Sequence, residues 1–171
     1  IDPASDESSI NGHAVTHMRG SQGSIVFIFS PPKSKPGTLN LLLSDGSPLP
    51  VRLGQQRVHW CLLDVHLSSS HTLDYTSLNA FTHTDKALVL FGPAGASGEI
   101  SINGTPLEVE VPKGRKPLVA EHEGMTLVVM CDEMTDETYL HGQTIYVGVG
   151  GLTAEGEPIP STGGKTHTVI N

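Results

Sequence analysis

The chain has 171 residues, the size of one domain, and its 19 glycines and 12 prolines are typical of a β protein rich in turns. Its 18 acidic residues against 10 lysines and arginines give a formal net charge of -8, which argues against nucleic acid or an anionic membrane as the partner. No apolar run approaches the ~20 residues that a membrane-spanning helix needs.

The first twelve residues are polar and carry neither the basic start nor the apolar stretch of a signal peptide. They predict a disordered leader or a cloning remnant at 1–12. Residues 13–171 are then predicted to form a single β-rich domain.

Runs of β-branched and aromatic residues predict at least ten strands in this domain. In the first half the runs are GSIVFIF (23–29), TLNLLLS (38–44), LPVRLG (49–54) and QRVHWCLLDVHL (56–67), with shorter ones at HTLDYTSL and NAFTHT. The second half contains KALVLFG, GEISING, TPLEVEVPKG, MTLVVMC (125–131) and QTIYVGVGGL (143–152). Proline-rich segments such as SPPKSKPG separate the runs, because proline cannot continue regular structure.

The glycine-rich stretch LVLFGPAGASGEISING (88–104) poses a choice between a phosphate-binding loop and a hairpin. A phosphate loop needs a helix N-terminus after its strand, whereas GEISING alternates polar and apolar residues as a half-buried strand does. There is also no Gly-Lys-Ser/Thr ending. The stretch therefore predicts a β-hairpin, with a positive φ at some of its glycines, Gly92, Gly95 and Gly98.

One segment, CDEMTDETYLHG (131–142), lacks a β-branched run. Asp132 suits a helix N-cap, acidic residues follow in the first turn, and Gly142 suits the end of a helix. The pattern predicts one short helix within 132–140, with Met134, Thr138 and Leu140 pointing inward. The same acids could be a calcium loop, but they lack its alternating spacing.

Cysteine and histidine give no pattern that indicates a metal. Cys61 and Cys131 lie in apolar runs, which favours buried thiols, with a disulfide as the alternative. The nine histidines are scattered, and the pair in the longest run, His59 and His66, falls on opposite faces of a straight strand. We predict no metal site and no cofactor.

Sugar binding requires an aromatic ring that stacks on the sugar, with polar groups beside it. Tyr75 lies near turn residues and is the better surface candidate; Trp60 is a second candidate, although its apolar run also suits a core position. Asp74 and Asn79 are the predicted polar partners. These four residues form the predicted ligand-binding site.

The order of motifs resembles a known family. The segment 56–99 and the later LVVMCDEMTDETYL (127–140) are similar to the accessory β-domain that follows the catalytic barrel in β-galactosidases of glycoside hydrolase family thirty-five. The resemblance covers residues 22–152. The matching positions are Asp64, Val65, Leu73, Tyr75, Thr76, Phe81, Leu88, Val89, Leu90, Phe91, Gly92, Gly95 and Tyr139.

The resemblance implies an all-β, mostly antiparallel, sandwich-like fold with one short helix. The family's catalytic glutamates belong to the barrel, so no catalytic residue is carried over and the chain is expected not to be an enzyme by itself. The expected function is that of a non-catalytic accessory domain that binds a polysaccharide or oligosaccharide weakly. The expected location is secreted or periplasmic, within a larger enzyme that degrades polysaccharides.

Two alternatives to sugar binding stay open. A structural domain that buttresses the catalytic barrel of a parent glycosidase would show a broad apolar patch on one face. A self-standing enzyme would show carboxylates that converge in a deep cleft.

Overall fold

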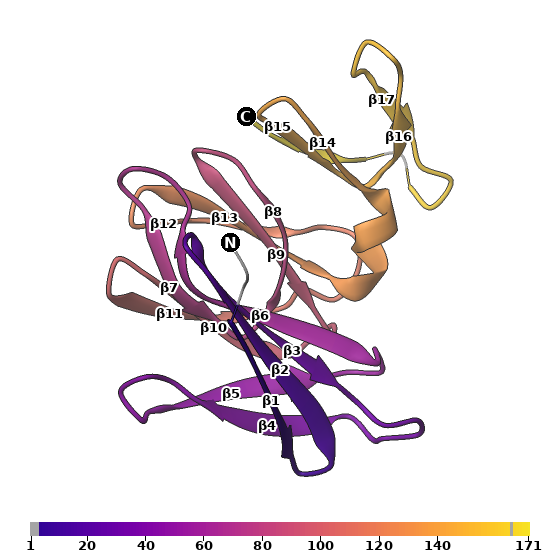
Figure 1. The fold of residues 1–171 in the computed structure, drawn as a ribbon. Helices are drawn as coiled ribbons and strands as arrows, with labels where there is room; N and C mark the ends of the chain where they lie inside the picture. Colours follow the sequence, from indigo (N-terminus) through magenta and orange to yellow (C-terminus); the bar gives the residue numbers. More distant parts are fainter. Residues whose placement is uncertain (1–3, 165) are drawn as a thin grey trace. The chain divides into compact units, whose positions relative to one another are not determined.

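Figure 1 shows the computed structural model, which describes residues 4–164 and 166–171. The first strands are β1 (Ala4–Ile10), β2 (His13–Gly20), β3 (Gly23–Phe29), β4 (Gly37–Leu42), β5 (Pro48–Leu53), β6 (Val58–His66), β7 (Thr72–Thr76), β8 (Asn79–His83) and β9 (Ala87–Gly92). The remaining elements are β10 (Ser97–Ile102), β11 (Thr105–Glu110), β12 (Leu118–His122), β13 (Met125–Cys131), the 3-10 helix η1 (Asp132–Glu137), β14 (Thr138–His141), β15 (Thr144–Val147), β16 (Val149–Leu152), β17 (Pro158–Pro160) and β18 (Thr168–Ile170). The predicted all-β fold with one short helix is confirmed.

The described chain divides into two compact units, whereas the sequence predicted a single domain. The first unit contains the residues up to Ala80 together with Ala96–Glu110, and the second contains Phe81–Gly95 together with Val111–Asn171. The chain therefore passes between the units more than once.

The first unit is sandwich-like. Seven antiparallel strands form a sheet in the order β1-β2-β3-β6-β7-β10-β11, and the β4–β5 hairpin packs against it. Alternate residues of the central strands point toward the hairpin, as the period of two requires. The buried core that they share comprises Val15, Val26, Ile28, Leu39, Leu41, Leu49, Val51, Leu53 and Cys61.

Strand β1 differs from the expectation for the N-terminus. Residues 4–10, which the sequence placed in a disordered leader, pair with β2 along their whole length, from Ala4 opposite Arg19 to Ile10 opposite His13. A polar sequence is compatible with an edge strand, because one face of an antiparallel sheet can remain in water. Residues 1–3 lie outside the described part.

The second unit is built from small sheets. Its largest has the order β12-β13-β9-β8, in which β13 and β9 run parallel, and the others are β14-β15-β18 and β16-β17. All six residues of β9 are buried, as are six of the seven in β13. Strands that are covered on both faces favour such continuous apolar runs.

The predicted hairpin at 88–104 is wrong. β9 pairs with β13, whereas β10 pairs with β11 and β7, so the glycine-rich segment joins two different sheets. Gly95 has the expected positive φ, at 75°, but Gly92 and Gly98 do not. Gly98 is needed for another reason: a Cβ there would lie 2.8 Å or less from three side-chain carbon atoms of Leu78.

The short helix lies within the predicted range of 132–140, but it begins one residue earlier than a cap at Asp132 implies and ends at Glu137. η1 covers Asp132–Glu137, with Cys131 as its N-cap and no side-chain hydrogen bond to the cap. Asp132 is thus the first helical residue and not the cap. Met134 and Thr138 are buried as predicted, but Leu140 is 42% exposed, and both Thr138 and Leu140 belong to β14 and not to the helix. The chain is already a strand at Leu140, so the helical periodicity that predicted a buried Leu140 no longer applies there.

Both cysteines are free and buried, which confirms the first of the two alternatives. Burial raises the pKa of the Cys61 thiol to about 12, because the thiolate would lose its hydration. The Cys131 thiol donates a hydrogen bond to the Gly114 carbonyl, 3.3 Å away. Both side chains serve packing, and neither has the exposure of a reactive thiol.

Candidate functional site

The sheet of the first unit carries apolar side chains on both of its faces. In β3, Val26 and Ile28 point into the core, so Ile25, Phe27 and Phe29 point to the opposite side. Their cross-strand partners on β2 and β6 extend this second surface, which we call the outer face. It comprises Ala14, Thr16, Met18, Ile25, Phe27, Phe29, Val58, Trp60 and Leu62.

Two phenylalanines of β3 lie on the outer face. Phe29 is 43% exposed, and Phe27 stacks beside it with ring centroids 6.3 Å apart and an interplanar angle of 28°. Phe27 is opposite Thr16 on one side and Trp60 on the other. Large apolar side chains left partly exposed in one contiguous area indicate a contact surface.

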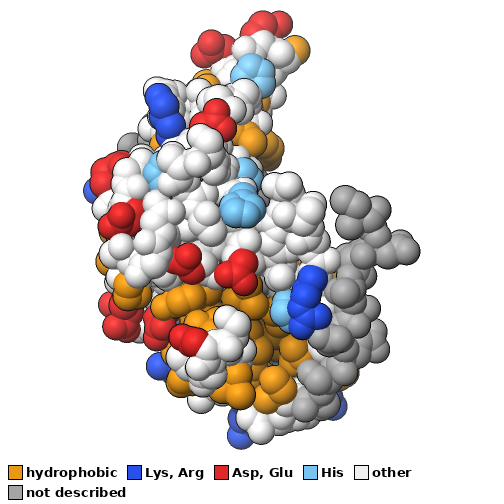
Figure 2. All heavy atoms as spheres, turned by 60° about the vertical axis from the view of Figure 1, so that its left-hand side comes forward, with side chains coloured by type: hydrophobic (Ala, Val, Ile, Leu, Met, Phe, Trp, Pro, Cys, Tyr) orange, Lys and Arg blue, Asp and Glu red, His pale blue; other side chains and the backbone are white. Residues whose placement is uncertain are grey.

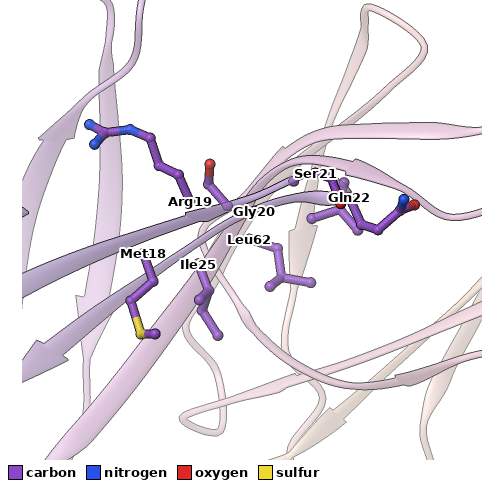
Figure 3. Close-up of a pocket in the computed structure, with 10 residues that line it drawn as sticks. Met18, Arg19, Gly20, Ser21, Gln22, Ile25 and Leu62 are labelled. Carbon is purple, nitrogen blue, oxygen red and sulfur yellow. The ribbon is translucent and has the colours of Figure 1, made fainter. Parts of the chain in front are cut away.

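A cavity of about 530 Å³ lies at one end of the outer face, next to the β2–β3 turn. Met18, Ile25 and Leu62 form its floor, and Figure 3 shows these three side chains pointing to the same side of the strands. The Arg19 side chain points the other way. Gly23 keeps this end tightly packed, because a Cβ there would lie 2.7 Å from the backbone of β6. The cavity therefore has an apolar floor, and the Arg19 side chain does not point toward that floor.

Two of the predicted sugar-binding residues hold the fold together. Asn79 is buried, and its Oδ1 accepts a hydrogen bond from the backbone N–H of Trp60 at 2.8 Å. The indole N–H of Trp60 donates to the Ala80 carbonyl at 2.9 Å. Trp60 and Asn79 are thus brought together, but the polar atoms that were expected to face a sugar are occupied by the protein.

The other two predicted residues lie on β7. The Oδ2 of Asp74 accepts hydrogen bonds from the Ser101 hydroxyl and the Gly104 backbone N–H, both at 2.7 Å. Tyr75 is opposite Leu63 and packs against the core. Because Leu63 is three residues from Trp60 along β6, Tyr75 and Trp60 point to opposite faces of the sheet. The four predicted residues therefore do not form one site.

Tyr75 lies close to carboxylates. Burial raises the pKa of its phenol, and the negative charges of Glu99, Asp74 and Asp45 raise it further. Asp45 belongs to the β4–β5 turn. Figure 2 brings forward the side of the molecule that lies on the left in Figure 1, and hydrophobic side chains gather there with acidic ones beside them. A half-buried ring with acceptors nearby suits a neutral sugar better than an anionic one.

Within residues 4–164 and 166–171, no three histidine, cysteine or acidic side chains are grouped so that they could hold a metal ion. None of the described helices has the length and apolar character required to cross a membrane.

The outer face was missed by the sequence reasoning, although a signal existed. Five of the six residues in SIVFIF (24–29) are apolar. In a strand such a run places apolar side chains on both faces, here on both faces of β3. Comparison with known proteins adds no assignment, since neither a protein-family model nor a curated protein matches the chain.

Proposed function

We propose that this chain is a non-catalytic accessory β-domain of an enzyme similar to the family thirty-five β-galactosidases, and that it docks on the catalytic barrel through its outer face. The observation that carries the proposal is the stacked pair Phe27 and Phe29, exposed on an apolar sheet face. The resemblance in sequence supplies the class of enzyme.

The chemistry of the outer face favours a protein partner over a sugar. Sugar hydroxyls need polar side chains that converge on the ring. Among the nine residues that define the outer face, Thr16 is the one polar member. Arg19 points away from the adjoining cavity, whose other polar lining residues are Ser21 and Gln22 in the β2–β3 turn and Ser24 at the start of β3. A folded protein surface, by contrast, can bury apolar side chains without replacing hydroxyl hydrogen bonds.

The first test concerns Phe29. Full burial of a phenylalanine contributes about 1.5–3 kcal/mol, and a charge introduced there would be buried without a partner. We expect Phe29→Asp to weaken binding to a separately produced catalytic barrel of a family thirty-five β-galactosidase at least tenfold, measured by titration calorimetry. Its matched control is Ile159→Asp, because Ile159 is 44% exposed and lies on β17. Equal affinities of the two variants, or no binding by the unaltered chain, would refute the docking proposal.

A second candidate function is weak binding of neutral, galactose-rich polysaccharide at Tyr75. The half-buried ring beside Glu99, Asp74 and Asp45 favours it. With one ring available for stacking, a dissociation constant on the order of 0.1–1 mM is expected. The carboxylates beside Tyr75 and the net charge of -8 should keep sulfated or uronic-acid polymers from stacking on this ring at low salt.

Affinity gel electrophoresis tests this second function. Neutral galactans should retard the unaltered chain and the control Tyr146→Ala, but not Tyr75→Ala. Retardation that survives in Tyr75→Ala, or none with any polymer, would remove the sugar-binding candidate and leave docking as the function.

A further inference from the structure

A cavity of about 280 Å³ in the second unit is lined by basic and hydroxyl side chains. Two neighbouring residues in the segment before β12 supply its cations, and the others come from the end of β15 and from the segment that enters β18. β15 and β18 are paired, with Val147 opposite Thr168, so the floor of the cavity is fixed by a sheet. The lining residues are Arg115, Lys116, Val147, Thr166, His167 and Thr168.

Arg115 is held in a fixed orientation. Its guanidinium donates to both carboxylate oxygens of Glu137, with Nη1 2.9 Å from Oε1, and Nη2 also lies 3.4 Å from the Gly148 carbonyl. Gly164 lies against it so closely that a Cβ there would be 2.8 Å from Nε. The bond from Arg115 also lowers the pKa of the Glu137 carboxyl, so this pair stays charged. A planar, immobilised guanidinium keeps its remaining N–H groups in fixed directions.

Lys116 leaves the cavity with a positive charge that is not cancelled. It is exposed and has no ion-pair partner among the described residues, whereas the charge of Arg115 is matched by Glu137. Among the described residues, no aspartate or glutamate lines the cavity, although acidic residues outnumber lysines and arginines in the chain by 18 to 10. The local charge is thus opposite to that of the whole molecule.

We propose that this cavity binds one small oxyanion, the carboxylate of an acidic sugar or a free sulfate or phosphate. Lys116 supplies the attracting charge, and the ring of His167 and the hydroxyls of Thr166 and Thr168 supply hydrogen bonds. The cavity's volume of about 280 Å³ leaves room for a small anion. The site is independent of the outer face and does not rest on the docking proposal.

The experiment is a nuclear magnetic resonance titration of the ¹⁵N-labelled chain at constant pH and ionic strength. Sodium galacturonate, sulfate and phosphate are added separately, with chloride as the balancing anion and galactose as the uncharged comparison. Saturable shifts are expected at the backbone amides of Lys116 and Thr166–Thr168. Saturation by galacturonate alone identifies the carboxylate of a sugar as the ligand, and saturation by sulfate or phosphate identifies a free oxyanion; both support the site.

Two variants make the test specific. Lys116→Gln should weaken the binding about tenfold, which corresponds to about 1.4 kcal/mol. Lys113→Gln removes the same charge three positions earlier, at an exposed residue that does not line the cavity, and should leave the affinity unchanged. Shifts that rise linearly without saturation, that galactose reproduces, or that Lys116→Gln leaves unaltered would overturn the proposal.

Discussion

Lowering the pH from about 7 to about 4 should reduce the free energy of unfolding by about 3 kcal/mol through one side chain, His59. His59 is 5% exposed on β6, and its Nε2 lies 3.0 Å from the Ser77 carbonyl. Burial lowers the pKa of this imidazole to about 4, and the hydrogen bond to Ser77 opposes the shift without cancelling it. The native protein therefore holds His59 neutral.

The direction of this pH dependence follows from comparing when His59 is protonated in the unfolded chain and in the folded chain. In the unfolded chain an imidazole takes up a proton below about pH 6.5, whereas folded His59 does so only near its lowered pKa of about 4. The stability that neutral His59 allows is thus complete above about pH 6.5 and is lost as the pH falls toward about 4. The predicted window is distinct from that of Glu137, whose lowered carboxyl pKa places its own loss at more acidic pH.

Urea unfolding at a series of pH values measures this effect. His59→Gln keeps an N–H that can donate to Ser77 and has no proton to gain, so its stability should change much less between pH 6.5 and 4. The exposed His66 on the same strand gives the control, His66→Gln, which should retain the full dependence. An unaltered pH dependence in His59→Gln would show that another group is responsible.

Replacing Gly98 with valine should lower the free energy of unfolding by about 3 kcal/mol, or the melting temperature by about 10 °C. A Cβ at this position would lie 2.8 Å or less from three carbon atoms of Leu78, and Leu78 is itself 1% exposed. A buried leucine cannot move aside without displacing its own neighbours. The loss should appear in stability and leave any ligand preference unchanged.

Gly37→Val is the matched control for Gly98→Val. Gly37 also lies in a strand, but the nearest atom to a Cβ there is 4.0 Å away and the residue is exposed. Its substitution should change the melting temperature by less than about 2 °C, since exposed substitutions cost within about 0.5 kcal/mol. If Gly98→Val melts together with Gly37→Val, the contact with Leu78 is not tight in solution.

The sequence predicts individual strands better than their partners. The hairpin prediction followed from the closeness of β9 and β10 along the chain, but the two strands have different burial patterns. β9 is apolar at every position from Ala87 to Phe91, as a strand covered on both faces is, whereas β10 begins with an exposed serine and a glycine. Strands that need different surroundings belong in different sheets. The difference in apolar pattern between β9 and β10 was visible in the sequence, and it is a better guide to strand pairing than closeness along the chain.

The candidate site was less predictable, because it depends on which face each residue occupies. Trp60 and Tyr75 are both aromatic and both near polar residues, and the sequence could not show that β6 and β7 pair Tyr75 with Leu63. A positive φ of 54° at Asp64 interrupts β6 just beyond that pair, so counting by twos from Trp60 fails there. The 280 Å³ cavity of the second unit brings Lys116 and His167 together, although the two residues lie far apart in the sequence and no local pattern links them.

The two units are interleaved along the chain, which affects how gene recombination and proteolysis could separate them. Ala96–Glu110 contributes β10 and β11 to the first unit, while the residues just before and after it belong to the second. A gene fragment that stops at residue 80 would encode the first unit without two strands of its sheet, and one that begins at residue 111 would encode the second without β9. Recombination should therefore transmit both units as one block, and a protease nick at residues 93–96 should leave two fragments that each retain a piece of both units.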